Sequence, residues 1–319
     1  MRLYSLRCFA ILLVILPAIV LVTGAQVEIR SSVATGNYTW TADNFAGFYY
    51  DIDNNMKTES LTTTVSGGNM LSGNVVDGVR GVVYNTTAQQ QEFEFSGWGS
   101  YNIIGFLAEK YFAGYVDTPN RINDVLYTES TDKSVLSNQQ LLKILIDDDN
   151  EETFDSNTPL RLKDGYALRI ISIDVDGSGV YVELTKDGES VDSEVISPDS
   201  SSVVEQTYFY KTYVGDSSDI VLIAVHFQSV FLGGDTAVAT IDGVWQLSDT
   251  PVDVAENSDY GKMTVQTVTD DSITMDNEGN DITLSKDNDI PLMPGISIKT
   301  ANSNDLRYYI YTEKTCNNF

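Results

Sequence analysis

The most constraining feature of this sequence is an alternation of apolar and polar residues that glycine-containing turns interrupt. It is clearest from Tyr166 to Thr185, with a turn at residues 176–179 and a second turn at Asp187-Gly188. Successive side chains of a strand point to opposite faces, so a period of two predicts half-buried strands. Glycine adopts positive φ without steric cost, which makes Asp-Gly a strong hairpin signal. The segment therefore predicts antiparallel strands joined by tight turns.

The same character extends over nearly all of the chain after residue 25, where Val, Ile, Tyr, Phe and Thr dominate. Further strands are expected within residues 203–214, 220–231 and 236–247. Turns recur about every 8–12 residues, which is typical of a β-sandwich. Helix is scarce, since Ser137 to Gln140 resembles a capping box with room for a turn or two after it. We predict an all-β protein.

The strands are expected to form two linked β-sandwiches. We predict a central sandwich at residues 160–248, inserted into a discontinuous outer sandwich of residues 26–159 and 249–319. The alternative is three consecutive units. A last unit of about 50–60 residues would sustain only a marginal core, which favours the insertion.

Residues 1–25 have the layout of a signal peptide. Arg2 and Arg7 form a positive start, Cys8 to Val22 is uncharged and almost wholly apolar, and Thr23-Gly24-Ala25 supplies small residues for cleavage. The apolar stretch is about 15 residues, short of the roughly 20 that span a bilayer. We expect cleavage after Ala25 and export. Membrane contact is expected only in the alternative, an uncleaved leader.

Composition excludes several functions. The chain has 46 acidic and 19 basic side chains and a net charge of -27. Nucleic-acid binding needs clustered Lys and Arg, so no nucleic-acid partner is expected. One histidine excludes a multi-histidine zinc site within one chain. Cys316 is the one cysteine outside the leader, which excludes a disulfide scaffold and leaves either an unpaired thiol or a link between molecules.

Three acidic clusters offer the hard oxygen ligands that Ca²⁺ prefers, at residues 51–55, 147–149 and 174–179. The third matches the first half of an EF-hand loop, but Thr185 stands where a bidentate Glu belongs and strands flank the loop. A hairpin turn is the favoured interpretation, and Ca²⁺ is the one cofactor considered. Its candidate ligands are Asp174, Asp176 and Ser178.

Other candidate sites have simple interpretations. Asn37 and Asn85 each begin an Asn-x-Thr sequon, so export would allow glycans there. His226 lies on the same strand face as Ala224 and Gln228, which we interpret as the polar or solvent face and a structural role. No G-x-S-x-G elbow is present, and a glycosidase pair requires two carboxyls about 5–9.5 Å apart, a distance that sequence does not supply. We predict no catalytic residues.

Seven stretches resemble, in order, the S-layer family duplication domain of methanogenic archaea. They are Phe45 to Asp53, Phe106 to Tyr115, Ile144 to Asp149, Ile173 to Gly177, Val244 to Asp249, Tyr260 to Met263 and Leu306 to Tyr309. The resemblance runs from about Val33 to Tyr311. It implies two linked β-sandwiches in a structural protein that tiles the cell surface as a porous, glycosylated, two-dimensional lattice, with no catalytic residues.

The resemblance has two departures. The major lattice proteins carry two copies of the domain, followed by a polar linker and a C-terminal membrane helix. One copy is visible here, and the sequence stops at Phe319. Both a lattice tile and an accessory secreted paralogue therefore stay open.

We predict a structural cell-envelope protein on the extracellular surface, not an enzyme. Its expected partners are copies of itself or other S-layer subunits, with divalent cations and attached glycans, and its acidic surplus would line pores. The alternative is a secreted adhesin or carbohydrate-binding module, in which exposed aromatic rings would stack on sugars. The candidates for such stacking are Tyr181, Tyr208, Tyr210 and Tyr213.

Overall fold

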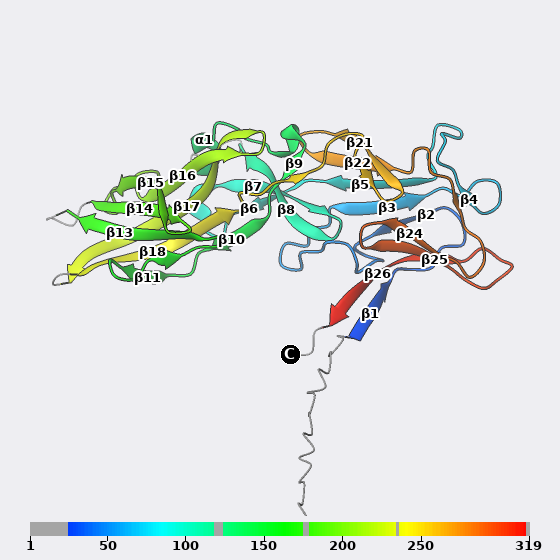
Figure 1. Cartoon of the computed structure of the whole chain (residues 1–319), viewed down its shortest axis with the longest axis horizontal. Helices are drawn as coiled ribbons and strands as arrows, with labels where there is room; N and C mark the ends of the chain where they lie inside the picture. Colours follow the sequence, from blue (N-terminus) through cyan, green and yellow to red (C-terminus); the bar gives the residue numbers. More distant parts are fainter. Residues whose placement is uncertain (1–24, 118–123, 175–178, 234–235, 317–319) are drawn as a thin grey trace, which may run out of the picture.

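The computed structural model describes residues 25–117, 124–174, 179–233 and 236–316. This part of the chain is almost entirely β-strand, which confirms the all-β prediction. The described helices are α1 (Val125–Glu129) and two 3₁₀ turns, at Ser96–Trp98 and Leu136–Asn138. In the described ranges no helix combines the length and apolar character needed to cross a bilayer. Figure 1 shows an elongated body from which the first and last strands project together.

One half of the body holds two sheets built from consecutive strands. The first has the order β10-β18-β17-β16, with β11 also paired to β18, and the second has the order β12-β13-β14-β15. The strands are β10 (Ile144–Asp148), β11 (Glu152–Asp155), β12 (Leu160–Arg161), β13 (Tyr166–Ile173), β14 (Val180–Lys186), β15 (Glu189–Ile196), β16 (Thr207–Val214), β17 (Ser217–Gly233) and β18 (Thr236–Leu247).

The hairpins expected in this half are confirmed. β13 pairs antiparallel with β14, and β14 pairs with β15 across the turn at Asp187-Gly188. Both turn residues have positive φ, 52° at Asp187 and 91° at Gly188, as a two-residue hairpin of matching twist requires. The turn expected at residues 176–179 lies mostly outside the described residues, except for Gly179.

The other half joins strands from distant parts of the chain. A four-stranded sheet has the order β1-β26-β25-β24, a six-stranded sheet has the order β2-β3-β5-β22-β21-β20, and β23 pairs with β4. The strands are β1 (Ala25–Arg30), β2 (Tyr38–Thr41), β3 (Glu59–Thr63), β4 (Met70–Leu71), β5 (Val82–Thr87), β20 (Asp259–Tyr260), β21 (Met263–Val268), β22 (Ser272–Asp276), β23 (Ile282–Thr283), β24 (Asp289–Met293), β25 (Ile296–Thr300) and β26 (Tyr308–Cys316). Both ends of the described chain thus meet in one sheet.

A smaller sheet lies between the halves, formed by β6 (Gln89–Glu92), β7 (Ser100–Phe106) and β8 (Glu109–Val116). Its alternate side chains enter two different hydrophobic clusters: Ile103 and Phe112 join the cluster around Trp245, whereas Ile104 joins the cluster around Trp40. Nearby, β9 (Gln140–Leu141) pairs with β19 (Val252–Asp253).

The two clusters indicate how the chain is divided between the halves. Apart from Met56, the first cluster draws its buried residues from Phe93 to Leu247. The second draws on residues 34–141 and 254–310. The domain limits at residues 160 and 248 stay a prediction, as does the packing of the sheets as sandwiches.

Candidate interaction surface

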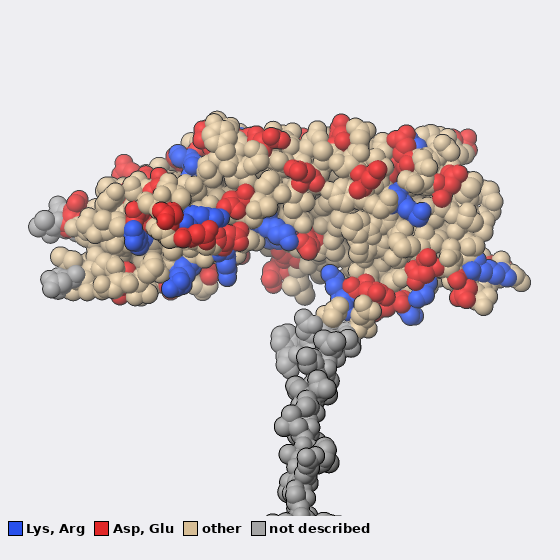
Figure 2. Space-filling view, in the orientation of Figure 1, with Lys and Arg blue, Asp and Glu red and all other residues tan. Residues whose placement is uncertain are grey.

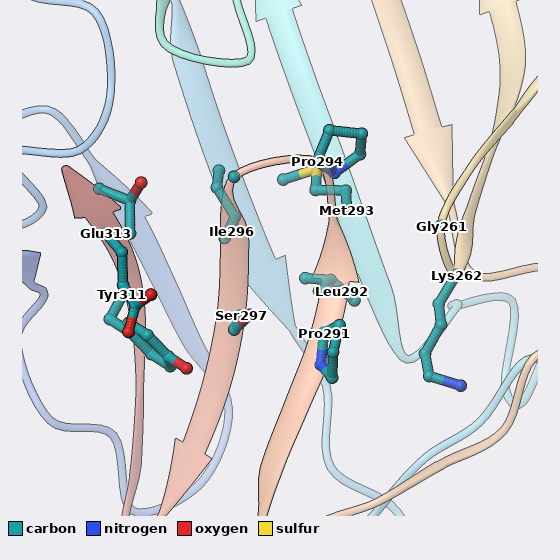
Figure 3. Close-up of a pocket in the computed structure, with 12 residues that line it drawn as sticks. Gly261, Lys262, Pro291, Leu292, Met293, Pro294, Ile296, Ser297, Tyr311 and Glu313 are labelled. Atoms are coloured by element: carbon teal, nitrogen blue, oxygen red, sulfur yellow. The ribbon is translucent and has the colours of Figure 1, made fainter. Parts of the chain in front are cut away.

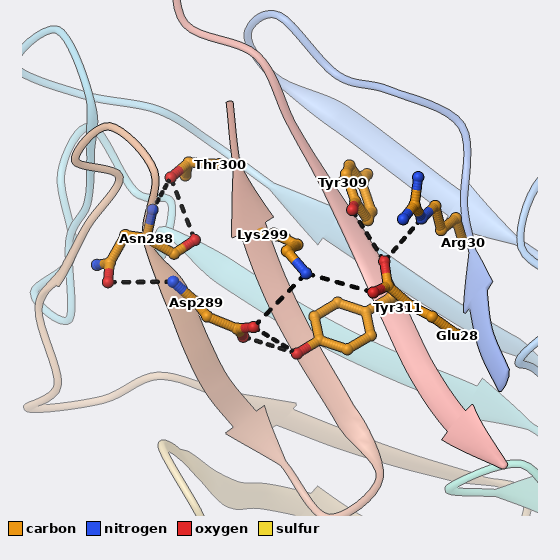
Figure 4. Close-up of polar contacts among 8 residues, drawn as sticks. All are labelled: Glu28, Arg30, Asn288, Asp289, Lys299, Thr300, Tyr309 and Tyr311. Atoms are coloured by element: carbon orange, nitrogen blue, oxygen red, sulfur yellow. Dashed lines mark hydrogen bonds and ion pairs between the residues drawn. The ribbon is translucent and has the colours of Figure 1, made fainter. Parts of the chain in front are cut away.

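We name the four-stranded sheet β1-β26-β25-β24 the terminal sheet, because it contains both ends of the described chain. Its two faces differ, as the period of two along a strand requires. Ile290, Leu292, Ile298, Tyr308 and Ile310 are buried and join the cluster around Trp40. The opposite face carries polar and charged side chains that alternate with them along the strands (Figure 4).

Glu28 is the centre of the polar network on this outer face. Its carboxylate accepts hydrogen bonds from the Tyr309 hydroxyl at 2.9 Å and from Arg30 Nε at 2.7 Å (Figure 4). Lys299 Nζ lies 3.3 Å from the second Glu28 oxygen. Partial burial opposes ionisation, but these donors hold the pKa of the Glu28 carboxyl below its usual value.

The network continues across the sheet to β24. Lys299 Nζ is 3.9 Å from the Asp289 carboxylate, which also accepts a 2.7 Å hydrogen bond from the Tyr311 hydroxyl. Arg30 lies over the Tyr309 ring and Lys299 over the Tyr311 ring, at 5.5 and 5.3 Å from the ring centroids. The cations thus sit between carboxylates and tyrosine rings. Arginine and tyrosine, both present on this face, are residue types enriched at protein interfaces.

A groove of about 610 Å³ adjoins this face (Figure 3). The hairpin between β24 and β25 forms its floor, with Pro291, Leu292, Met293, Pro294 and Ile296 in the lining. Lys262 and Glu313 provide its charged side chains, on opposite sides in Figure 3. A groove with one lysine and one glutamate among apolar residues has the composition of a contact surface rather than of a paired-carboxylate active site.

The three acidic clusters predicted as calcium candidates lie in three different structural settings. Asp174 is exposed, and its amide donates to the Gly179 carbonyl at 2.9 Å, while Asp176 and Ser178 lie outside the described residues. Asp51 accepts hydrogen bonds from the amides of Asp53 and Asn54, at 3.0 and 3.1 Å. Over the described ranges, no three His, Cys, Asp or Glu side chains gather as metal ligands would. The Asp174, Asp176 and Ser178 site stays a prediction.

Asp147, from the second cluster, is engaged inside the protein. It accepts hydrogen bonds from the Tyr101 hydroxyl at 2.7 Å and from the Glu94 amide at 3.1 Å. Burial raises the pKa of its carboxyl, against the opposing effect of the Tyr101 hydrogen bond. This carboxylate ties β10 to β7 and the segment before it.

The two sequons occupy different settings. Asn37 is exposed before β2, and its Oδ1 accepts a 2.8 Å hydrogen bond from the Val65 amide. Asn85 is half-buried in β5, where its Oδ1 accepts a hydrogen bond from the Thr274 hydroxyl at 2.9 Å. Glycosylation of either asparagine stays a prediction.

His226 is not on a solvent face, so that part of the interpretation was wrong. The residue is 6% exposed, its ring stacks on Phe95 with centroids 4.2 Å apart, and its Nδ1 is hydrogen-bonded to Asp242. The alternation along β17 correctly places His226 on the opposite strand face from Val225 and Phe227. Phe95, from a distant segment, packs on the His226 face and buries it. The sequence alone does not reveal that cover.

The tyrosines predicted as sugar platforms do not form one exposed row. Tyr208 is fully buried and donates to the Asp192 carboxylate at 2.7 Å, and the ring of Tyr210 packs beside Tyr166. Tyr181 and Tyr213 are exposed, at 38% and 72%. This arrangement does not favour the carbohydrate-binding alternative.

One buried carboxylate was missed by the sequence analysis. Glu59 is 2% exposed and accepts hydrogen bonds from the Tyr49 amide at 2.6 Å, the Tyr84 hydroxyl at 2.8 Å and the Ala108 amide at 3.0 Å. Ala108 and Leu107 form the β7–β8 turn with positive φ, 69° and 52°. Glu59 therefore stabilises a turn that non-glycine residues rarely adopt, and its oxygens are all engaged.

These features define an acidic, all-β protein whose prominent polar clusters are engaged in structural contacts. A model of the S-layer protein family matches residues 30–302. The chain therefore belongs to the S-layer protein family, which confirms the resemblance seen in the seven stretches.

Individual relatives agree with this assignment. The "Major S-layer protein" of Methanosarcina mazei is 34% identical over 297 residues, which cover 90% of this chain and 40% of that relative. The proteins of the same name from Methanosarcina barkeri and Methanosarcina acetivorans are also 34% identical, over 299 and 298 residues. The chain thus spans about 40% of the length of these curated relatives.

Proposed function

We propose that this chain is a structural unit of the cell envelope, one that forms or joins a porous, acidic, two-dimensional lattice on the outer surface of an archaeal cell. The observation that carries the proposal is the family match, which extends over residues 30–302. The relatives named as major S-layer proteins align with 90% of the chain. Its partners would be further copies or other S-layer subunits.

The mechanism is packing rather than chemistry. A lattice needs at least two complementary surfaces on each unit, and the outer face of the terminal sheet, with its alternating charges and tyrosines, is one candidate. Gaps between units would form the pores. An elongated body, as in Figure 1, covers area with few subunits.

The charge would give those pores their selectivity. Acidic residues spread over the face seen in Figure 2, with basic ones between them, and the whole chain carries a net charge of -27. A negative wall repels anions and attracts cations, but salt screens it within about 8 Å under physiological conditions. Narrow pores would therefore select by charge, and wide pores would not.

Divalent cations and glycans are part of the proposal. Ca²⁺ or Mg²⁺ between acidic surfaces would lower the repulsion between neighbouring units, and glycans at Asn37 and Asn85 would extend from the surface. Intact mass spectrometry of the exported protein tests three features together. It should show cleavage after Ala25 and added glycan mass that disappears with Asn37→Gln and Asn85→Gln.

The lattice itself is tested by assembly of the exported chain. Purified protein should form ordered sheets on electron-microscope grids when Ca²⁺ or Mg²⁺ is added, and it should be found in envelope fractions of the host. A protein that stays monomeric at high concentration with either ion, and that is absent from the envelope, would exclude lattice membership.

A further inference from the structure

The terminal sheet has two edge strands, and they differ in how their free backbone groups are protected. β24 contains Pro291, its register shifts between Pro291 and Met293, and its Leu292 carbonyl accepts the Lys262 amide at 2.7 Å. β1 contains no proline and pairs with β26 in unbroken register from Ala25 to Arg30. Prolines, bulges and covering groups prevent an edge from pairing with another strand. β24 has these protections, whereas over Ala25–Arg30 the described residues give β1 none of the three.

The register identifies which groups of β1 are open. The Ser31 amide donates to the Ile310 carbonyl at 3.0 Å, in the same register as the β1–β26 pairing. In an antiparallel ladder, residues that exchange hydrogen bonds with the partner alternate with residues whose backbone groups point away. Val27 and Ile29 therefore bond β26, whereas Gln26, Glu28 and Arg30 present their backbone groups at the open edge. This edge belongs to the part that projects from the body in Figure 1.

We propose that β1 pairs antiparallel with β1 of a second copy, with Glu28 of each copy opposite Arg30 of the other. The two-fold axis would then pass between the two Ile29 residues. This inference rests on the proposed function, because it names one of the contacts that a lattice requires.

Charge selects this register over its neighbour. A pairing centred on Glu28 would use the same open backbone groups, but it would place two carboxylates directly opposite each other. Like charges opposite each other destabilise a strand pair, and opposite charges stabilise it. The register centred on Ile29 instead forms two Glu28–Arg30 pairs. The Arg30 side chain is 62% exposed and can reach across the new strand pair.

The contact would join two four-stranded sheets into one continuous sheet. It is isologous, since the same surface serves both copies, and it closes after two copies. A lattice would therefore need a second and different contact on each unit.

Engineered disulfides test the register in the full chain, with Cys8 and Cys316 replaced by Ser. In the proposed pairing the two residues 29 form a non-hydrogen-bonded pair with Cα atoms about 4.5 Å apart, within the disulfide range of about 4.4–6.8 Å. Mild oxidation of Ile29→Cys should give a dimer on a non-reducing gel, while the matched variant Glu28→Cys should stay monomeric. The reverse result would establish the other register and overturn the Glu28–Arg30 pairs. No cross-link in either variant would overturn edge pairing.

A charge reversal tests the same contact without cysteines. Arg30→Glu places carboxylates opposite Glu28 and should weaken dimerisation at least about tenfold in sedimentation experiments. Arg307→Glu, an exposed arginine in the β25–β26 loop, is the matched control and should leave dimerisation unchanged. Equal weakening by both variants would overturn the specific pair. The two proposals can fail separately. If the protein forms ordered sheets but neither cysteine variant cross-links, β1 pairing is wrong and the lattice proposal stands. If Ile29→Cys cross-links but the protein never forms sheets, the lattice proposal is wrong and β1 pairing stands.

Discussion

The sheets around Trp245 join strands that follow one another in the chain, whereas the sheets around Trp40 join strands from its opposite ends. β13, β14 and β15 form successive hairpins, as do β16, β17 and β18. Near Trp40, by contrast, β1 pairs with β26 and β5 pairs with β22. Pairings between distant segments require closure of long loops before any contact is made. The region around Trp40 therefore depends on both ends of the chain, and the region around Trp245 does not.

Deletion of β26 should produce the largest difference between the two regions. Deletion of residues 308–319 takes away the strand between β1 and β25 and the buried side chains of Tyr308 and Ile310. We expect amide exchange in β24 and β25 to accelerate by at least about 100-fold, roughly 3 kcal/mol, while β13 to β18 keep their protection. Deletion of residues 317–319 alone is the control. Equal acceleration in both regions would show that the protein unfolds as one unit.

Two matched tryptophan substitutions probe the clusters separately. Trp245 and Trp40 are both fully buried, and each indole donates a hydrogen bond, to the Tyr115 hydroxyl at 3.0 Å and to the Ser32 carbonyl at 2.8 Å. Each Trp→Ala change should lower the free energy of unfolding by about 3–5 kcal/mol through the cavity and the lost contacts. In hydrogen exchange, each should weaken mainly its own region. Identical exchange patterns for the two variants would contradict the comparison.

Glu59→Gln tests the buried carboxylate in the region around Trp40. The amide keeps the size of the side chain but turns an NH₂ group toward one of the three donors, so we expect a loss of about 1–3 kcal/mol in urea unfolding. Glu109→Gln, at an exposed carboxylate on β8, is the comparison and should cost less.

The same variant should change the pH dependence. Burial raises the pKa of Glu59 above 4.5, so the folded protein holds this proton more tightly than the unfolded chain. The stability that this group contributes is then greatest below pH 4.5 and is lost as the pH rises through the raised pKa. Glu59→Gln has no such titration. The difference in free energy of unfolding between the wild-type protein and this variant should therefore narrow as the pH rises from 4.5 through the raised pKa. A constant deficit across the interval would show that the pKa is not raised.

The smallest effect is expected at the β14–β15 turn near Trp245. Gly188 has a φ of 91°, and no atom lies close to the position that a Cβ would take. Gly188→Ala should therefore cost about 1–2 kcal/mol from backbone strain alone. Gly36→Ala, at a glycine without positive φ and with open space around it, should be neutral in the same thermal melts. A neutral Gly188→Ala would mean that the turn relaxes.

The comparison also explains what sequence could predict. Alternation and Asp-Gly turns act over a few residues, so the all-β class, β13 to β18 and their hairpins were predictable. The terminal sheet was not, because nothing in residues 26–30 indicates that their partners are residues 311–315. A spacing of two places Glu28 and Arg30 on one face of their strand, and it does the same for Tyr309 and Tyr311. Contact between the two pairs, however, depends on the β1–β26 register.

The burial of His226 and Tyr208 was not predictable from the sequence for a related reason. Local alternation assigns a side chain to one face of a strand, but it does not tell which distant element covers that face. Phe95 covers His226, and Asp192 binds the Tyr208 hydroxyl. Only tertiary packing decides between an exposed polar face and a second buried one.

The pairing of β1 with β26 also determines how the protein would respond to tension. Ala25 lies opposite Cys316 at the open end of this strand pair, and the two strands run back into the body side by side (Figure 1). A force that pulls the two ends apart would load the hydrogen bonds of this ladder one after another, as in a zipper, instead of all at once in shear. Peeling in this way requires little force. A coat built from such units would resist swelling of the cell best when the load passes from flank to flank of neighbouring bodies and not through the chain ends.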